Sequence, residues 1–314
     1  MTNLGAIFFP RGIGTPHQLL SLAAELEQAG MDHLFMVEGG NDALTVLSAL
    51  ALRTERATIG SGIANIYIRH PYALALAAAV VESLSNGRLV LGLGTAHQVT
   101  NVQGLGLSME KPLTRMREYV AVVRALLTPG ASRADIRTER YQATGVVNAW
   151  PPQRPVPIIL AALGFGSVRL AAQVADGVIL SLATREQITR IRQTLNEEAA
   201  RVGRDGRQLR IYAIVNTVVR ARREEALPLL RAAVAGYLRM PFYQRQLAEN
   251  GVTITDGTIS DTDLERLGIA GTLEQAREGI AAFREAGADV LLLSPGAGEP
   301  DQPAAYRAFT RLLT

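Results

Sequence analysis

Cysteine is absent from the 314 residues of this chain, and histidine occurs only four times. Without cysteine, the chain forms no disulfide bond, carries no thiolate nucleophile and offers no sulfur ligand to zinc. Four histidines are also too few for a histidine-rich metal centre. We therefore expect no metal site.

Runs of like charge are absent as well. The formal net charge is +3, and Lys111 is the only lysine among 32 basic residues. Because the basic residues are scattered along the chain, it lacks the concentrated positive surface that is typical of nucleic-acid-binding proteins. We expect no nucleic-acid partner.

Long hydrophobic stretches are also missing. The longest apolar run, from Ala73 to Val81, is about half of the roughly 20 residues that a membrane-spanning helix needs. The first residues, from Met1 to Leu4, lack the basic segment that begins a signal peptide. We expect a cytoplasmic protein with no membrane partner.

The chain does contain a regular alternation of short apolar segments and amphipathic helical patterns, and 48% of its residues are hydrophobic. This alternation is typical of the βα repeat of a parallel sheet. The eight expected strands cover residues 4–9, 33–37, 58–63, 89–93, 157–160, 177–180, 209–215 and 290–293. Eight strands favour an α/β fold with one closed (β/α)8 TIM barrel over residues 1–314.

A doubly wound sheet is the alternative, because its strands and helices alternate with the same period. Against it, Gly92-Leu93-Gly94 lacks the third glycine of a dinucleotide-binding fingerprint at the right distance.

Helices are expected between the strands, and several carry start signals, such as the prolines that follow Thr15 and His70. Two connections are longer than ordinary barrel loops. Residues 129–155 read as a small hairpin, and residues 239–271 read as a helical extension between the seventh and eighth strands. Insertions after barrel strands typically lie over the ligand end, so we expect both there. The expected helices cover residues 16–29, 43–53, 71–83, 113–127, 167–174, 185–201, 224–238, 273–286 and 304–313.

In a barrel of this type the functional groups follow the carboxyl ends of the strands. These positions hold few ionisable groups, with no Ser-His-Asp arrangement, no cluster of acids and no lysine, so a bound organic cofactor would supply the missing reactivity. The candidates are Glu38, Asn41, Asn65, Tyr67, Arg69, Thr95, His97, residues 162–166, Ser181, Asn216 and Ser294.

Two of these side chains are candidate proton donors or acceptors. His97 carries an imidazole that titrates near neutral pH, although it could equally cap a loop carbonyl. Glu38 directly follows an apolar strand, where partial burial would raise the pKa of its carboxyl group. Alternatively, Glu38 pairs with an arginine or caps the helix that follows.

Glycines mark two further positions. Gly62 and the turn after Gly94 end their strands with backbone suited to close ligand approach. The segment Leu163-Gly164-Phe165-Gly166-Ser167 joins the fifth strand to a helix, and free amides at a helix start bind anions. An ordinary tight turn that needs glycine is the alternative for this segment.

These residues resemble the luciferase-like monooxygenase superfamily, whose barrel enzymes use FMN or the deazaflavin coenzyme F420. The resemblance covers the chain from the first strand to the last helix. It is carried by Thr54-Glu55-Arg56, Gly62-Ile63-Ala64-Asn65, Arg69-His70-Pro71, Leu84-Ser85-Asn86-Gly87-Arg88, Leu91-Gly92-Leu93-Gly94, Ala175-Asp176-Gly177-Val178, Gly271-Thr272 and Ala286-Gly287-Ala288-Asp289.

The order Ser61-Gly62-Ile63 resembles the F420-dependent branch. That resemblance implies a cis peptide bond between Gly62 and Ile63 behind the deazaflavin ring. It also implies that the cofactor is held by Gly62, Ile63, Ala64, Asn65, Thr95, Ala96, His97, Ala162, Gly164, Phe165 and Gly166.

One departure concerns the second strand, where many relatives place Asp-His or His-His and this chain has Glu38-Gly39-Gly40-Asn41. The resemblance therefore leaves Glu38 or His97 to exchange the proton. It implies an F420-dependent oxidoreductase that transfers a hydride between the deazaflavin C5 and a small organic substrate. Trp150, Tyr141 and Phe242 in the insertions favour a flat or apolar substrate.

Two alternatives keep the same fold. The first is a two-component monooxygenase that receives reduced FMN from a separate reductase, and the second is a flavin-binding barrel without catalytic activity. A homodimer is common in this superfamily and is expected here.

Overall fold

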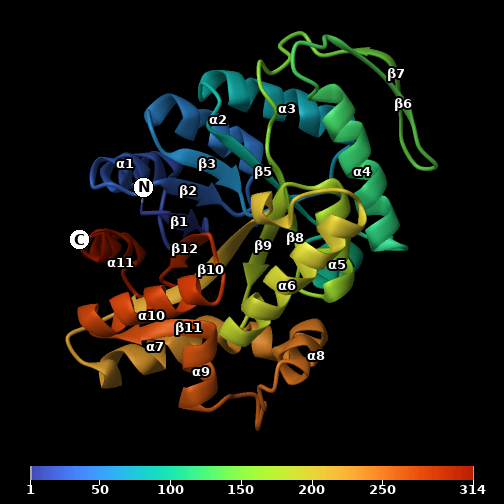
Figure 1. Cartoon of the computed structure of the whole chain (residues 1–314). Helices are drawn as coiled ribbons and strands as arrows, with labels where there is room; N and C mark the ends of the chain where they lie inside the picture. Colours follow the sequence, from blue (N-terminus) through green and yellow to red (C-terminus); the bar gives the residue numbers. More distant parts are fainter. Residues whose placement is uncertain (1, 314) are drawn as a thin grey trace.

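Eight parallel strands close into a barrel in the computed structural model, which describes residues 2–313 (Figure 1). Each strand pairs with the next one in the series, and the last pairs with the first. The predicted (β/α)8 barrel is therefore confirmed. The predicted single domain also includes residues 1 and 314, which lie outside the described residues. The barrel strands are β1 (Leu4–Phe8), β2 (His33–Met36), β3 (Thr58–Ser61), β5 (Leu89–Gly94), β8 (Ile158–Ala161), β9 (Gly177–Ser181), β10 (Arg210–Val219) and β12 (Val290–Ser294).

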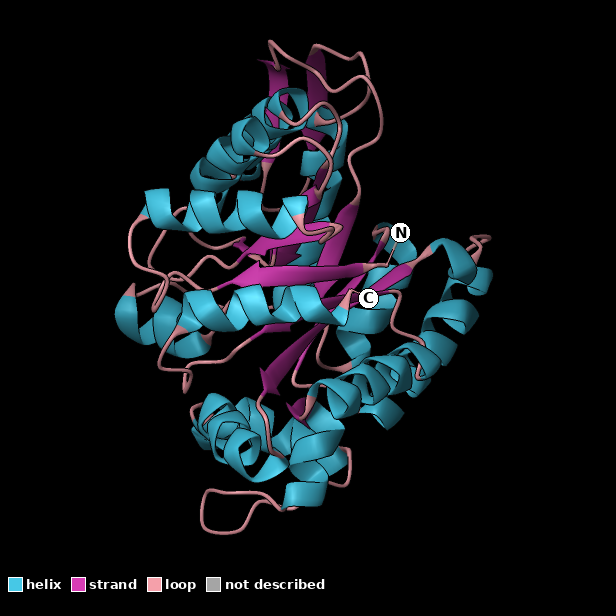
Figure 2. Ribbon diagram, turned by 90° about the vertical axis from the view of Figure 1, so that its left-hand side faces the viewer, coloured by secondary structure: helices cyan, strands magenta, loops and turns pink. Residues whose placement is uncertain are grey.

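Helices cover the outside of this barrel (Figure 2). The proline start signals are confirmed, since α1 begins at Pro16 behind a Thr15 cap and α3 begins at Pro71. His70 accepts a hydrogen bond from the backbone N–H of Tyr72, so it caps α3. The helices between barrel strands are α1 (Pro16–Gln28), α2 (Ala43–Arg53), α3 (Pro71–Leu84), α4 (Pro112–Leu126), α5 (Phe165–Val174), α6 (Arg185–Arg201), α7 (Arg223–Ala235) and α10 (Leu273–Glu285), and α11 (Gln302–Ala308) follows β12.

The first insertion forms the predicted hairpin, with β6 (Arg133–Arg137) antiparallel to β7 (Gln142–Val147). It packs along the outer side of α4, where the backbone N–H and guanidinium of Arg140 bind Glu118 (Figure 1). Tyr141 lies edge-on to Tyr119 of α4, so it anchors the hairpin to the barrel. The expectation that this insertion covers the ligand end was wrong, because its apolar side faces α4 instead.

The second insertion contains the predicted helices, α8 (Pro241–Glu249) and α9 (Asp261–Leu267). The sequence analysis missed β11 (Gly268–Gly271), a short strand that pairs with the last four residues of β10. Strand β10 is longer than predicted for the same reason. Its first half pairs with β9, and its last residues have β11 as a partner.

The interior of the barrel is filled by side chains up to its carboxyl end. Eight of them form a buried cluster, namely Ile7, Phe35, Val90, Ile159, Ile179, Tyr212, Val290 and Leu292. One step further toward the carboxyl ends, the side chains against this cluster are only partly buried, namely Phe9, Val37, Ile63, Ala161 and Ile214. They form an accessible floor surrounded by the loops that follow the strands.

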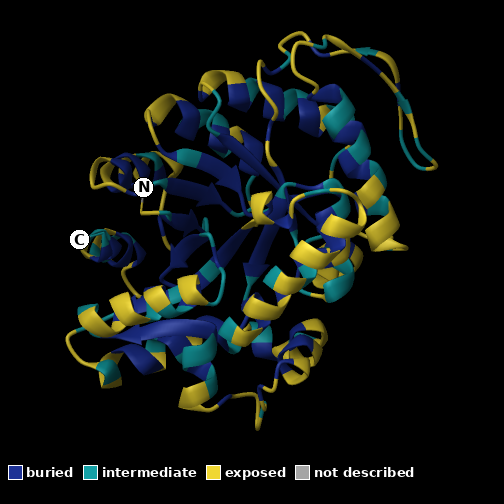
Figure 3. Ribbon diagram, viewed as in Figure 1, coloured by how far each residue is buried: buried dark blue, intermediate teal, exposed yellow. Residues whose placement is uncertain are grey.

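Burial follows this arrangement, with buried strands in the centre and exposed residues on the outward faces of the helices (Figure 3). Among the described helices, none combines the length and the apolar character that crossing a bilayer would require.

Candidate active site

Three neighbouring strand ends bring the predicted cofactor residues together. The peptide bond between Gly62 and Ile63 is cis, as the resemblance implied. Strand β3 stops at Ser61, before the predicted end, and the chain resumes pairing with β5 as β4 (Ala64–Asn65). Since β5 also pairs with β8, the ends of β4, β5 and β8 lie side by side.

The glycines of these strands make room for neighbouring side chains. A Cβ on Gly94 would lie 2.4 Å from Cγ1 of Ile63, and a Cβ on Gly62 would lie 2.6 Å from Cδ1 of Ile7. The side chain of Ile63 can therefore lie against the end of β5. The expectation that these glycines admit a ligand is replaced by a packing role, and the ligand-facing element is the partly exposed Ile63.

His97 stands at the end of the turn after β5 and is exposed to solvent on one side. Its ring lies 5.9 Å from the Tyr243 ring and 6.4 Å from the Tyr237 ring, centre to centre. Partial burial among these groups lowers the pKa of His97 below its ordinary value. Both tyrosines come from the second insertion, so this insertion does reach the carboxyl end of the barrel.

The two tyrosines form a compact aromatic pair beside His97. Their rings are 5.0 Å apart in a T-shaped arrangement, and Phe242 packs on the far side of Tyr243. Burial raises the pKa of both phenols, and a hydrogen bond between Ser181 and Tyr243 acts in the opposite direction. Both phenols are therefore neutral at physiological pH. The sequence analysis named Phe242 but missed Tyr237 and Tyr243.

Glu38 is held by several partners at the end of β2. One carboxylate oxygen accepts hydrogen bonds from the Arg69 guanidinium at 2.6 Å and from the backbone N–H of Ala43 at 3.2 Å. The other accepts the backbone N–H of Asn65 at 2.7 Å. The side chain is only 4% exposed. These contacts match the alternative of an arginine-paired carboxylate that caps α2, while a proton-donor role for Glu38 stays a prediction.

A buried asparagine that the sequence analysis missed connects two of the strand ends. Asn101 lies in a π-helical turn (Val99–Gly104), and its side chain is fully buried. Its Oδ1 accepts a hydrogen bond from Nδ2 of Asn65, and its Nδ2 donates to the carbonyl oxygen of Thr95. An isolated asparagine in an irregular loop gives no periodic signal, so the sequence alone could not single it out.

The glycine-rich turn after β8 lies next to this group. Helix α5 begins at Phe165 with Gly164 as its N-cap residue, and no side chain caps it among the described residues. The guanidinium of Arg190 lies 5.9 Å from the centre of the Phe165 ring. Ala162 is buried in the wall, and its backbone N–H donates to Ile179. The start of α5 is therefore accessible and positive in potential, as an anion site requires.

Two buried glutamines fasten this turn to the second insertion. Gln187 of α6 donates to the carbonyl oxygen of Leu163 at 3.1 Å, and Gln246 of α8 donates to Oε1 of Gln187 at 2.8 Å. Arg190 also donates to Asn250, just after α8. Helix α8 is thus bound to the glycine-rich turn on one side and contacts His97 on the other.

The remaining candidates have structural partners. Arg69 bridges Glu38 and Asp42, and the ring of Tyr67 lies under the Arg115 guanidinium at 4.6 Å. Ser294 is buried and accepts the backbone N–H of Gly296. Trp150 is 66% exposed on the first insertion, away from the strand ends, so its predicted role in the substrate site finds no support.

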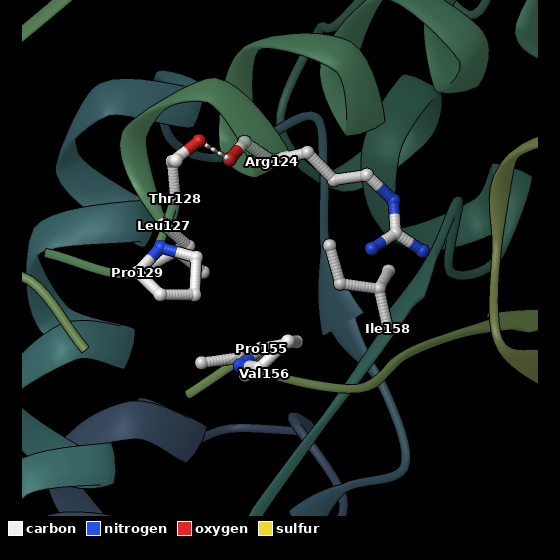
Figure 4. Close-up of a pocket in the computed structure, with 7 residues that line it drawn as sticks. All are labelled: Arg124, Leu127, Thr128, Pro129, Pro155, Val156 and Ile158. Carbon is white, nitrogen blue, oxygen red and sulfur yellow. Dashed lines mark hydrogen bonds between the residues drawn. The ribbon is translucent and has the colours of Figure 1, made fainter. Parts of the chain in front are cut away.

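A separate pocket lies beside the start of β8, lined by Arg124, Leu127, Thr128, Pro129, Pro155, Val156 and Ile158 (Figure 4). Ile158 is the first residue of β8, whereas the glycine-rich turn follows its last residue. The pocket therefore belongs to the amino-terminal end of the barrel, and active sites of such barrels occupy the carboxyl end.

Comparisons with known proteins agree with this geometry. The model of the family described as luciferase-like monooxygenase matches residues 5–290. A 5,10-methylenetetrahydromethanopterin reductase of Archaeoglobus fulgidus is 29% identical over 67% of this chain, and the alignment spans 62% of that protein. A Mycobacterium tuberculosis protein that bears the provisional name of a coenzyme F420-dependent oxidoreductase is 27% identical over 92% of this chain and 93% of its own length.

Among solved structures, the coenzyme F420-dependent tetrahydromethanopterin reductase of Methanopyrus kandleri has the same fold. It superposes with a TM-score of 0.83 at 18% identity, over 98% of this chain and 96% of its own.

Proposed function

Because this chain belongs to the luciferase-like monooxygenase family, we propose that it is an oxidoreductase that binds coenzyme F420. The reaction is the transfer of a hydride between C5 of the deazaflavin and a small organic substrate. The names of the relatives support this proposal, since they describe reductases and an F420-dependent oxidoreductase.

The observation that carries the proposal is the convergence of three ligand-facing segments at adjacent strand ends. Ile63 supplies an apolar surface, the turn 95–97 supplies His97, and the start of α5 supplies free amides. A cofactor with a flat ring and a phosphate group fits this set, because the ring needs an apolar backing and the phosphate needs amides at a helix start.

The described residues at these strand ends include no reactive nucleophile, so the bound deazaflavin would supply the hydride chemistry. The protein contributes orientation and a proton path. Since the lowered pKa keeps His97 neutral at pH 7, its imidazole is ready to accept a proton from a substrate hydroxyl during oxidation. In the reductive direction the same nitrogen returns that proton.

The direct test is a titration of the purified protein with oxidised F420 and, separately, with FMN, followed by fluorescence. Binding of F420 in the micromolar range or tighter, with weaker FMN binding, is the expected result. Preference for FMN would replace the proposal with a two-component monooxygenase. Binding of neither would contradict the cofactor assignment.

Turnover then identifies the catalytic role of His97. With F420 bound, a panel of alcohols and carbonyl compounds is screened by the absorbance change of the deazaflavin. We expect His97→Gln to bind F420 as tightly as the unmodified protein and to lose most of its turnover. A variant that retains full turnover would remove His97 from the mechanism.

A further inference from the structure

Asn101 differs from its chain neighbours in a way that points to a specific task. It is fully buried, whereas the residues on both sides of it are exposed. Burying an amide is unfavourable unless its hydrogen bonds are satisfied, at a cost of about 1–3 kcal/mol for each unpaired group. The contacts of this side chain therefore fix the conformation of the surrounding loop.

Those contacts converge on the turn that carries His97. Asn101 Nδ2 donates to the carbonyl oxygen of Thr95 at 2.6 Å, and the backbone N–H of Asn101 donates to the carbonyl oxygen of His97 at 3.0 Å. One residue thus fixes both ends of the turn. Between them, Ala96 has a φ of 50°, which is unfavourable for a residue with a side chain and persists only where the surroundings hold it.

The other side of Asn101 is tied to a neighbouring strand. Its Oδ1 accepts a hydrogen bond from Nδ2 of Asn65 at 2.7 Å, and the backbone N–H of Asn65 donates to Glu38 at 2.7 Å. Glu38 is in turn paired with Arg69. A continuous polar chain therefore runs from the ends of β2 and β4 to the turn of His97.

We propose that Asn101 is a positioning residue that holds His97 at the active site through its bond to the Thr95 carbonyl, and that Asn65 and Glu38 support it. Neither asparagine touches the reacting atoms. This inference rests on the proposed function, because the position of His97 matters only where its imidazole exchanges a proton.

The test compares Asn101→Ala and Asn101→Asp with a matched control, Asn148→Ala. Asn148 is 2% exposed and also satisfies backbone groups, donating to Leu126 and accepting from Trp150, but it lies outside the active site. Asn101→Asp keeps an oxygen that can accept from Asn65 and loses the donor for Thr95. It therefore isolates the bond that the inference depends on.

The first readout is independent of cofactor and activity. With only four histidines, each imidazole can be followed by NMR with labelled histidine, and His97 is assigned with His97→Gln. In both Asn101 variants we expect the His97 signals to move and the titration midpoint to rise toward its ordinary value, as the imidazole leaves the tyrosines. In Asn148→Ala both stay as in the unmodified protein.

The second readout is kinetic. In both Asn101 variants we expect kcat to fall by about 10- to 100-fold with KM nearly unchanged, because a misplaced proton acceptor affects the chemical step. If folded Asn101→Asp keeps the His97 signals and midpoint of the unmodified protein, the inference is overturned. If instead His97→Gln keeps full activity, the proposed role of His97 fails, while the NMR comparison still decides whether Asn101 positions it.

Discussion

The imidazole of His97 and the phenol of Tyr243 come from opposite halves of the chain and lie 5.9 Å apart, ring centre to ring centre. Tyr243 is 4% exposed, so it shields one side of the imidazole from water. Because a charged imidazole is less well solvated there, the pKa of His97 is lowered. The second insertion therefore tunes the group that the first half of the barrel supplies.

A first prediction follows for pH dependence. Tyr243→Ala should bring the pKa of His97 back up toward its ordinary value, because water replaces the phenol. A reaction that needs neutral His97 will then lose activity at a higher pH as the solution is acidified. The measurement is the acidic limb of kcat against pH, together with the NMR midpoint of His97.

Tyr243→Phe is the control, because it keeps the ring and removes only the hydroxyl group. We expect its acidic limb to coincide with that of the unmodified protein. An upward shift of equal size in both variants would mean that the hydroxyl, rather than the shielding, sets the pKa.

A second prediction concerns stability in acid. Both ring nitrogens of His33 are buried without a hydrogen-bond partner, and burial lowers the pKa of this histidine to about 4. Unfolding restores a pKa near 6.5, so between these values the unfolded chain binds more protons. Stability should therefore fall as the pH is lowered from about 6.5 toward 4, by an amount on the order of 3 kcal/mol.

Denaturant unfolding at pH 7 and pH 5 measures this effect. His33→Phe should reduce the loss of stability between the two pH values, because the replacement does not titrate. His17→Asn is the control, since His17 is exposed on α1. If His33→Phe loses as much stability as the unmodified protein, other groups cause the acid sensitivity.

A third prediction separates the two roles considered for Glu38. As an anchor, Glu38 is required for folding stability, and removing one partner of a buried ion pair typically costs about 3–5 kcal/mol. Glu38→Ala should lose stability on this scale, and Arg69→Ala with it should recover part of the loss. Thermal unfolding of the two single variants and the double variant gives the coupling.

The competing role makes a different prediction for Glu38→Gln, which is nearly the same size. A proton donor at this position would leave Glu38→Gln folded, with an unshifted His97 signal and almost no turnover. An anchor would leave turnover and the His97 signal changing together. The comparison therefore decides which role Glu38 has.

The sequence predicted the barrel well because its signals are local. Strand and helix positions depend on runs of apolar residues and on starts such as Thr15-Pro16, and these agree with the structure to within one or two residues for most elements. The short strand β11 gave no such signal, since Gly-Ile-Ala-Gly lacks alternation and depends on the free edge of β10 for its partner.

The candidate site divides in the same way. His97, Gly164 and Phe165 were found because they follow strand ends, which topology brings together. Tyr243 and Asn101 were missed because their importance comes from contacts between distant segments. The role of Glu38 stayed open for a related reason, because its arginine partner lies 31 residues away in the chain.

The last prediction tests the start of α5 as the site for a phosphate. Gly164 has extended backbone, and no atom lies within 4 Å of the position that its Cβ would take, so larger residues fit there. Asp and Asn are both good N-cap residues and should stabilise α5 by roughly 1 kcal/mol relative to Ala. Only Asp adds a negative charge where an anionic ligand would bind.

The three variants Gly164→Ala, Gly164→Asn and Gly164→Asp therefore separate folding from binding. We expect the melting temperature to be higher for Asn and Asp than for Ala, and F420 affinity to be lowest for Asp, by about tenfold or more relative to Asn, as like charges meet at the helix start. Equal F420 affinity of the Asn and Asp variants, with both folded, would place the phosphate elsewhere. A salt dependence that weakens binding to the Ala variant and leaves the Asp variant almost unaffected would identify the lost contact as electrostatic.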